Sequence, residues 1–500
     1  MTSQTFGIGA ALMLYFAGMM AIGIFYCRRM RSVSDYILGS RSLGTWVTSM
    51  SAEAADMSGW LMLGLPGYAY CAGMQAGWIA LGLIIGTYIN WKVVAGRLRT
   101  YTQVANDSLT LPDYLHNRFH DSSNALKIVS AIFILIFFLI YTSSGFVAGG
   151  KMFHAVFNVP YSWAMLLGAF VIVFYTFLGG FMAVCWTDFV QGVMMFFAIL
   201  IVPFAGMVLL GGPSATFAAL GSVSGELLNP FTAIGGKQLS LMAVISLMAW
   251  GLGYFGQPHI IIRFMAIRTA RQIPQARRIA MVWVVLSLTA AVAVGLVGRV
   301  FLKEPLQGAA TETVFIVMTD RIFTSFFAGI VFSAVLAAIM STASAQLLVT
   351  SSAVSQDIYK ALIHKQAGEK ELLQVSRWSV IVVAVIAVAL GANPENRVLD
   401  LVAYAWAGFG AAFGPAILVS LYWKRMTGKG ALAGIIMGGT TVLVWKQFGW
   451  FGMYEIVPGF VLSVITIIAV SLIDKTPSEK ILREFELSRS CEPSSPEKAY

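Results

Sequence analysis

The stretch that decides the fold runs from Ser49 to Trp60 and reads SMSAEAADMSGW. It lies inside an apolar segment from about 45 to 70, yet it carries the carboxylates Glu53 and Asp56 and three serine hydroxyls. A charged side chain at the centre of a bilayer costs about 2.5–3.5 kcal/mol on insertion scales, so such residues usually line an ion or substrate path. A glycine and a Pro-Gly pair follow and weaken the helix further. The stretch therefore predicts an interrupted helix with exposed carbonyls at a binding site, and the alternative is a polar helix start at the membrane surface.

The composition of the whole chain agrees with a membrane location. Its 500 residues are 58% hydrophobic and 11% charged, whereas soluble domains are about 45–50% apolar and about 25% charged. Apolar runs recur along nearly the whole length, and each is long enough to cross a hydrocarbon core of roughly 30 Å as a helix. Outer-membrane barrels need short alternating strands instead. We therefore expect an all-α polytopic membrane protein in a lipid bilayer.

The apolar runs, divided at glycine, proline and charged residues, predict thirteen membrane-spanning helices. They cover about 6–27, 45–70, 75–98, 126–150, 161–180, 188–211, 238–259, 277–302, 323–355, 377–392, 398–423, 430–448 and 456–473. If the amino terminus lies outside, most of the 33 Lys and Arg residues fall on cytoplasmic connections, as the positive-inside rule requires. We expect one transmembrane domain over 1–474, and a cytoplasmic tail over 475–500 that is disordered because it is charged and contains Pro and Ser.

A second interrupted segment is predicted from Trp250 to His259, which reads WGLGYFGQPH. Three glycines and a proline within ten residues argue against a regular helix. Interruptions in the second and seventh spans suggest two five-helix halves, spans 2–6 (about 45–211) and 7–11 (about 238–423), related as inverted repeats. Such an arrangement places a binding site where the two broken helices meet. The alternative for Gly251 and Gly253 is close helix packing.

Two adjacent hydroxyl residues, Ser341 and Thr342, lie within the ninth predicted span. Hard cations prefer oxygen ligands, so hydroxyls and carbonyls at this place suit a sodium ion. The alternative is that each hydroxyl bonds to its own helix backbone.

Several other classes of function find no support in the sequence. No Gly-rich loop precedes a Lys and a Ser or Thr as nucleotide binding needs, and no GxSxG motif indicates a nucleophile. The net charge of +10 comes from basic residues spread between apolar segments, so no nucleic-acid partner is expected. We predict a protein that is not an enzyme, has no organic cofactor and needs no obligate protein partner.

Longer motifs resemble one known family. They are DYILGSRSLG (35–44), DMSGW (56–60), INWK (89–92), GYFGQPH (253–259), MST (340–342), ANPENRV (392–398) and WKQFGW (445–450). On these motifs, which extend over nearly the whole chain, the sequence resembles the sodium/solute symporters. The resemblance implies thirteen helices and the inverted-repeat architecture of the leucine transporter.

The resemblance also implies a function, namely import of L-proline coupled to Na⁺ by alternating access across a bacterial inner membrane. The implied sodium ligands are Ala54, Met57, Ala338, Ser341 and Thr342, with Asp56 adjacent. The implied proline-binding residues are Ser58, Gly59, Trp60, Tyr141, Trp250, Tyr254 and Pro258. The implied gating or coupling residues are Arg41, Asp188 and Arg377. Two alternatives stay open: a symporter of the same family for another small amino acid or organic acid, and a transporter-like solute sensor.

The sequence departs from the family pattern at Glu53 and Ala55, where the family has a small residue and a serine. Glu53 is expected to be solvated near the membrane interface, because long charged side chains extend toward water. The alternative is that its carboxylate faces the cytoplasmic vestibule and changes the local potential.

Overall fold

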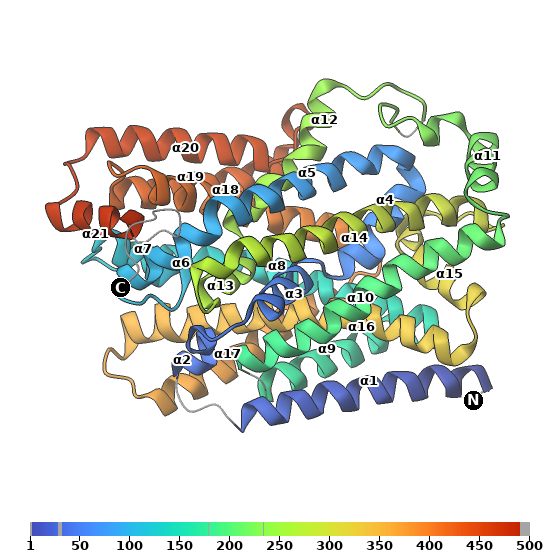
Figure 1. Ribbon diagram of the computed structural model, residues 1–500, viewed down its shortest axis with the longest axis horizontal. Coiled ribbons are helices and arrows are strands. Elements are labelled where there is room, and N and C mark those ends of the chain that lie inside the picture. The colour runs from blue at the N-terminus through green and yellow to red at the C-terminus, as the bar shows by residue number, and fades with distance from the viewer. Residues whose placement is uncertain (1–2, 29–32, 179, 234, 491–500) are drawn as a thin grey trace.

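The computed structural model describes residues 3–28, 33–178, 180–233 and 235–490. Within these ranges all regular structure is helical, and the β-type pairings are two isolated bridges, Leu43 with Ile267 and Thr232 with Gln238. Long helices run side by side along the longest axis of the molecule (Figure 1). The start of α1 (Ser3–Cys27) lies at one end of this bundle and α21 (Glu479–Ser490) at the other.

The remaining helices follow one another with short connections. The α-helices are α2 (Val33–Leu38), α3 (Thr45–Asp56), α4 (Leu65–Ala72), α5 (Gly77–Ile89), α6 (Ala95–Val104), α7 (Leu111–Phe119), α8 (Ala125–Phe157), α9 (Tyr161–Leu178), α10 (Phe181–Leu209), α11 (Pro213–Val223), α12 (Leu241–Met248), α13 (Pro258–Ala266), α14 (Ile273–Phe301), α15 (Val314–Ile322), α16 (Ser325–Ser352), α17 (Glu369–Leu390), α18 (Val398–Tyr422), α19 (Gly428–Phe448) and α20 (Ile456–Ile473). Segments of 3₁₀- or π-helix are η1 (Gly39–Arg41), η2 (Trp60–Gly64), η3 (Gly73–Ala76), η4 (Asn90–Val94), η5 (Gly225–Leu228), η6 (Ala249–Gly256), η7 (Ala270–Gln272), η8 (Gly308–Thr313), η9 (Ala353–Ile363) and η10 (Trp450–Gly452).

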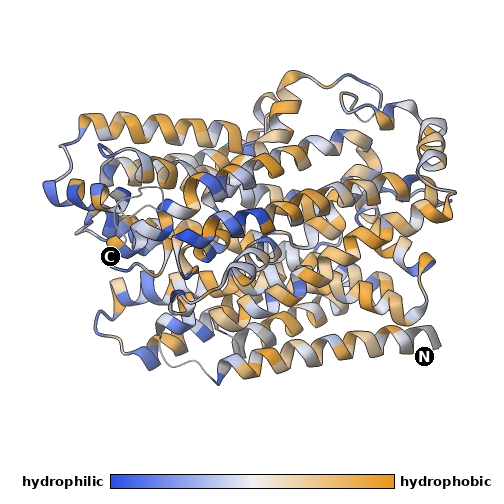
Figure 2. Ribbon diagram, viewed as in Figure 1, coloured by the Kyte–Doolittle hydropathy of each residue, from blue (hydrophilic) through white to orange (hydrophobic). Residues whose placement is uncertain are grey.

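Ten helical stretches in the described part of the chain are long and apolar enough to cross a membrane. Each of the thirteen predicted segments overlaps at least one helix, but three of them, 45–70, 75–98 and 238–259, are divided into several shorter helices. The count of thirteen spans stays a prediction. Hydrophobic residues dominate the long helices, and hydrophilic residues gather at the end of the bundle that holds α21 (Figure 2).

Both predicted interruptions are confirmed. The first lies between α3 and η2, where Met57 has φ −83° and ψ 78° and leaves the helical conformation. The second lies between η6 and α13, where Gln257 has φ −80° and ψ 106°. Backbone groups at such breaks are not all used within the helix, so they are available to a ligand.

Close packing explains two glycines of the second interruption as well. A Cβ atom on Gly251 would collide with the carbonyl of Gly82 on α5, and one on Gly253 would collide with the indole of Trp406 on α18. The packing alternative is therefore also correct for Gly251 and Gly253. They lie in the interrupted segment, and they let η6 approach α5 and α18 closely.

The carboxyl-terminal segment differs from the expectation of disorder. Glu479–Ser490 form α21, which turns Ile481, Phe485 and Ser488 inward at helical spacing. The ring of Phe485 lies edge-on to Tyr101 with 6.1 Å between centroids. Few but regularly spaced apolar residues were enough to bury one face of this charged helix. Residues 491–500 lie outside the described residues.

Candidate functional site

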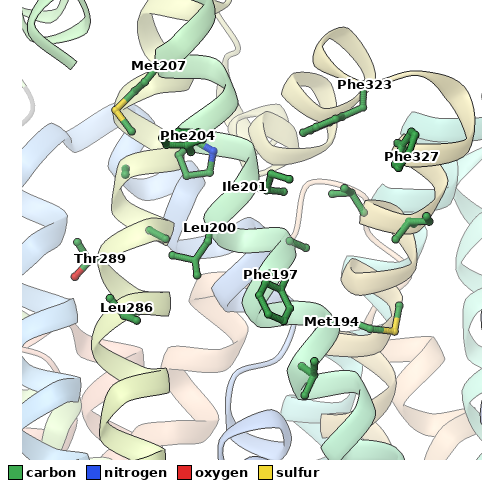
Figure 3. A pocket seen from close by; sticks show the side chains of 17 residues that line it. Met194, Phe197, Leu200, Ile201, Phe204, Met207, Leu286, Thr289, Phe323 and Phe327 are labelled. Carbon is green, nitrogen blue, oxygen red and sulfur yellow. The ribbon is translucent and has the colours of Figure 1, made fainter. Parts of the chain in front are cut away.

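An apolar cavity of about 840 Å³ opens between α10, α14 and α16 (Figure 3). Its lining includes Phe197, Phe204 and Phe327, which are all more than half exposed. None of the site residues that the sequence predicts lines it. Because its walls offer almost no polar atoms, it suits hydrocarbon chains and is no candidate for a polar solute or an ion.

Asp56 is the centre of the polar interior. It is the last residue of α3 and is fully buried, so its carboxylate does not face solvent. The hydroxyl of Tyr254 donates to Asp56 Oδ2 at 2.6 Å. The backbone carbonyl of Asp56 accepts the indole N–H of Trp60 at 3.1 Å and the hydroxyl of Tyr141 at 3.3 Å. Asp56 Oδ1 has no hydrogen-bond partner among the described residues.

A cluster of four oxygen atoms lies beside the end of α3. The carbonyl of Ala54 accepts hydrogen bonds from the hydroxyls of Ser341 at 2.7 Å and Thr342 at 3.3 Å on α16. Ser341 also bonds to the carbonyl of Ala338 at 3.2 Å, one turn back on its own helix. The own-backbone alternative therefore holds only for Ser341, which bonds both to its own helix and to Ala54 on α3, whereas the Thr342 hydroxyl bonds to Ala54. Met57, the fifth residue of the implied sodium site, is buried at the helix break next to this cluster.

Aromatic rings surround the two interruptions. The rings of Trp60 and Trp250 lie 6.3 Å apart between centroids, and Tyr254 lies edge-on to Trp406 at 5.0 Å. Trp250 also stacks on Tyr454 at 5.7 Å, and its carbonyl accepts the Trp406 indole N–H at 2.7 Å. Sequence reasoning missed Trp406 and Tyr454, since nothing distinguishes them from other aromatic residues of apolar segments.

The remaining implied substrate residues occupy different positions around this centre. Ser58 follows the break at Met57, Gly59 begins the next helical stretch with φ −50° and ψ −22°, and a Cβ on Gly59 would come within 2.7 Å of Ala148 Cβ on α8. Tyr141 on α8 lies edge-on to His259 at 5.7 Å. Pro258 begins α13 and lines a gap of about 10 Å³ that Ile134 and Asp357, among others, also line.

Asp188 on α10 forms a fully buried ion pair with Arg263 on α13, with 3.0 Å between Oδ2 and Nη2. The hydroxyl of Ser51 on α3 donates to the same carboxylate oxygen at 2.7 Å and accepts Arg263 Nε–H at 3.1 Å. This triad joins three helices beside the interruptions. Sequence reasoning named Asp188 but missed Arg263, because the partners are far apart along the chain.

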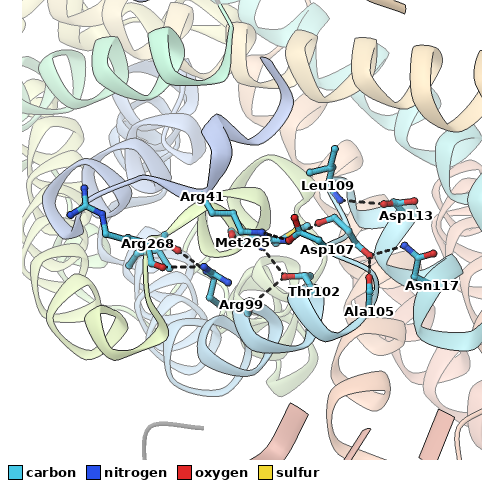
Figure 4. A network of polar contacts seen from close by, with 12 residues as sticks. Arg41, Arg99, Thr102, Ala105, Asp107, Leu109, Asp113, Asn117, Met265 and Arg268 are labelled. Atoms are coloured by element: carbon cyan, nitrogen blue, oxygen red, sulfur yellow. Dashed lines mark hydrogen bonds and ion pairs between the residues drawn. The ribbon is translucent and has the colours of Figure 1, made fainter. Parts of the chain in front are cut away.

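Arg41 joins η1 to three other segments (Figure 4). Its guanidinium contacts Asp107 at 2.8 Å, the Met265 carbonyl at 2.7 Å, the Ser108 carbonyl at 2.9 Å and the Thr102 hydroxyl at 3.1 Å. Burial lowers the pKa of Arg41, and the Asp107 carboxylate opposes that shift. Arg41 and Asp188 thus both hold α13, one through Met265 and the other through Arg263.

Arg377, the third implied gating or coupling residue, is not part of that arrangement. It lies half-buried on α17, within electrostatic range of the Tyr36 hydroxyl on α2. The structure therefore brings two of the three implied residues to α13 and leaves the third on another contact, between α17 and α2.

The expectation for Glu53 is wrong. The side chain is not solvated near the interface: it is 2% exposed, and its Oε1 accepts the indole N–H of Trp91 at 3.1 Å. The packing of η4 against this face of α3 excludes the water that the sequence-based expectation assumed.

A second buried ion pair lies far from Asp188 along the chain. Lys151 on α8 contacts Glu312 on η8 at 2.5 Å, and both side chains are less than 10% exposed. The Glu312 carboxylate also accepts the backbone N–H groups of Val398 at 2.9 Å and Leu399 at 3.1 Å. It therefore caps the amino end of α18, where a negative charge stabilises the helix. No sequence motif marked this contact.

Comparisons with known proteins show what the sequence and the fold are similar to. The sequence model of the Sodium:solute symporter family matches residues 36–438 of this chain. The chain is 50% identical to the Sodium/proline symporter of Escherichia coli (strain K12), with 94% of each chain covered. It is 46% identical to the High-affinity proline transporter PutP of Bacillus subtilis (strain 168), with 93% of this chain and 98% of the relative covered. The fold is similar to that of a Na⁺-coupled sialic acid symporter in a substrate-bound outward-open state, with a TM-score of 0.77 at 17% identity over 95% of this chain and 99% of that chain.

Proposed function

The chain belongs to the Sodium:solute symporter family, and from that premise we propose that it imports L-proline together with Na⁺. It is a multi-pass transporter of the bacterial inner membrane rather than an enzyme. The observation that carries the proposal is the oxygen cluster of Ala54, Ser341 and Thr342 beside the buried carboxylate of Asp56. An ion held there would connect an interrupted helix of one half of the chain to a helix of the other.

The sodium ion is held by oxygen atoms at the break of α3. Its ligands are the carbonyls of Ala54, Met57 and Ala338 and the hydroxyls of Ser341 and Thr342. A hard cation prefers such oxygen donors to nitrogen or sulfur. Asp56 lies close by and offsets the positive charge in surroundings where an uncompensated charge is costly.

Proline is bound next to the sodium ion, among Ser58, Gly59, Trp60, Tyr141, Trp250, Tyr254 and Pro258. The indole and phenol rings suit the flat apolar pyrrolidine ring. Backbone groups freed at the two breaks and nearby hydroxyls suit the carboxylate and the secondary ammonium group.

The finer architecture belongs to the same proposal. Thirteen spans cross the membrane within one domain over 1–474, and spans 2–6 and 7–11 form leucine-transporter-like inverted repeats. The amino terminus lies outside and the carboxyl terminus lies in the cytoplasm. The bias of Lys and Arg toward one set of connections supports this orientation.

Transport requires movement of the broken helices. Asp56, Trp60, Tyr141 and Tyr254 are all at most 1% exposed, so solutes reach them only when packed elements separate. Arg41 and Asp188 hold α13 in its present position and therefore act on gating. At a membrane potential of 100 mV, one inward positive charge releases about 2.3 kcal/mol. Coupling requires that sodium raise proline affinity, typically by 1–3 kcal/mol.

The test is uptake of radiolabelled proline by proteoliposomes with an imposed inward sodium gradient, with a potassium gradient as the control. We expect accumulation only with sodium, which also separates a transporter from a solute sensor. Competition by other small amino acids and organic acids tests the alternative substrates. Absence of accumulation by folded, reconstituted protein would overturn proline as the substrate.

A further inference from the structure

Two cavities meet where the start of α7 contacts η9. The smaller one, of about 10 Å³, has Pro258 in its wall, which belongs to the proposed proline site. The larger one, of about 330 Å³, is lined mainly by polar and charged residues, Lys127 among them. Thr110 and Asp357 line both cavities. These two side chains therefore form the wall that separates the cavities.

A hydrogen bond joins the two residues of this wall. The Thr110 hydroxyl donates to the Asp357 carboxylate, at 3.2 Å from Oδ2 and 3.3 Å from Oδ1. The same hydroxyl oxygen accepts the backbone N–H of Asp113 at 3.1 Å and so caps the amino end of α7. Asp357 is 0% exposed and Thr110 is 6% exposed. One buried hydroxyl thus attaches the start of α7 to η9.

Lys127, near the start of α8, approaches the same carboxylate from the larger cavity. Its Nζ lies 2.8 Å from Asp113 Oδ1 and 3.8 Å from Asp357 Oδ1. A buried charge without partners is costly, so the Thr110 hydroxyl and Lys127 together allow a carboxylate at this depth. If α7 and η9 move apart, Asp357 loses the hydroxyl, and water must take its place. Opening this contact therefore brings water into the wall between the cavities.

The position of Asp357 is connected to the proposed sodium site by one helix. α16 ends at Ser352 and η9 begins at the next residue, so the two segments are continuous. α16 carries Ser341 and Thr342, the proposed sodium-binding hydroxyls. The segment η9 is π-helical, and π-helical turns are frequent at functional sites. A movement of α16 at the sodium site is thus carried along the helix to Asp357.

We propose that Thr110 and Asp357 close the cytoplasmic exit of the proline site. The proposal rests on the proposed function, which places proline beside Pro258 and the connection between α6 and α8 in the cytoplasm. When the start of α7 separates from η9, the two cavities join into one polar route by which a zwitterion can leave. Asp357 is a positioning residue, because it holds the wall closed and belongs to neither the proposed proline site nor the proposed sodium site.

The test measures how fast a membrane-impermeant maleimide reaches the smaller cavity. Ile262→Cys places a thiol in the wall of that cavity, in a parent chain whose Cys27, Cys71 and Cys491 are replaced by serine. Cys185 is buried on α10, lines neither cavity and is kept as a reporter of general loosening. Inside-out membrane vesicles are labelled with sodium and without proline, and mass spectrometry follows each thiol separately.

We expect Asp357→Ala to label the introduced thiol about fivefold faster than the parent, which corresponds to the loss of one hydrogen bond from the closed contact. Asp113→Ala is the matched control. It removes the other carboxylate beside Lys127, but Asp113 lines only the larger cavity, so the introduced thiol should keep the parent's rate. The labelling rate of Cys185 should be the same in all three proteins.

Equal labelling of the introduced thiol in Asp357→Ala and the parent would overturn the proposal. Parallel acceleration at Cys185 would also overturn it, because the variant would then be loosened throughout, and so would acceleration only in right-side-out vesicles, because the route would then face outside. If Asp357→Ala does not fold, Thr110→Ala tests the same contact, and Thr110→Ser, which keeps the hydroxyl, should restore the parent's rate. Failure of the proposed function is distinguishable, since the labelling needs no proline flux and proline uptake could be absent while Asp357 still closes the route.

Discussion

The hydroxyl of Tyr254 donates a hydrogen bond to the carboxylate of Asp56 at 2.6 Å, and this contact joins the two interrupted helices of the bundle. Asp56 is the last residue of α3, and Tyr254 lies in η6, almost two hundred residues later. Both are buried, so the bond forms in surroundings of low dielectric constant where it is strong. A change of charge at Asp56 therefore acts directly on Tyr254 in the second interrupted helix.

Removing the carboxylate of Asp56 should abolish sodium-driven uptake. Asp56→Ala removes the negative charge that offsets sodium. The variant should still reach the membrane, because the apolar helices that insert into the bilayer are unchanged. Radiolabelled proline uptake and membrane content by immunoblot check this. Near-normal uptake by the variant would remove Asp56 from the site.

Removing only the hydroxyl of Tyr254 should weaken proline binding. The bond to Asp56 positions the Tyr254 ring in the proposed proline site. Because a hydrogen bond to a charged group is worth about 1.5–3 kcal/mol, its loss should weaken proline binding by at most roughly ten- to hundred-fold. Equilibrium binding of labelled proline to Tyr254→Phe checks this. Tyr101→Phe is the matched control, because the buried Tyr101 hydroxyl has no partner within the described residues. An equal loss in both variants would speak against a specific role for Tyr254.

Loss of either α16 hydroxyl should raise the sodium concentration needed for half-maximal uptake. Ser341→Ala and Thr342→Ala each remove one proposed ligand, and a loss of about 1 kcal/mol corresponds to about fivefold. Thr350→Ala is the control, because the Thr350 hydroxyl bonds to the Gln346 carbonyl on its own helix. An unchanged sodium curve with altered proline affinity would assign these hydroxyls to the substrate pocket instead.

Breaking the ion pair between Asp188 and Arg263 should destabilise the protein. Removing one partner of a buried pair leaves an uncompensated charge and costs about 3–5 kcal/mol, whereas removing both avoids that penalty. Thermal unfolding in detergent of Asp188→Ala, Arg263→Ala and the double variant checks this, with the double variant expected to lose less than the sum of the single losses. Additive losses would show that the two residues act independently.

The class of fold and the two interruptions could be read from local sequence. Repeated apolar runs of about twenty residues predict a bundle of membrane helices. The bilayer core has no water to bond backbone N–H and C=O groups, so these groups must bond to one another within each helix. The polar SMSAEAADMSGW stretch and the glycines before Pro258 mark the breaks for the same reason: they are costly in lipid and poor in a helix.

Only the tertiary structure decided which distant groups meet. Arg263 pairs with Asp188, Lys151 with Glu312, and Trp406 packs on Tyr254, and none of these partners is marked by local spacing. Glu53 shows the difference most clearly. Its sequence neighbours allow a solvated side chain, yet the packing of Trp91 over α3 buries it. Burial and the choice of partner depend on how helices that are far apart in sequence pack together, which no local pattern of residues contains.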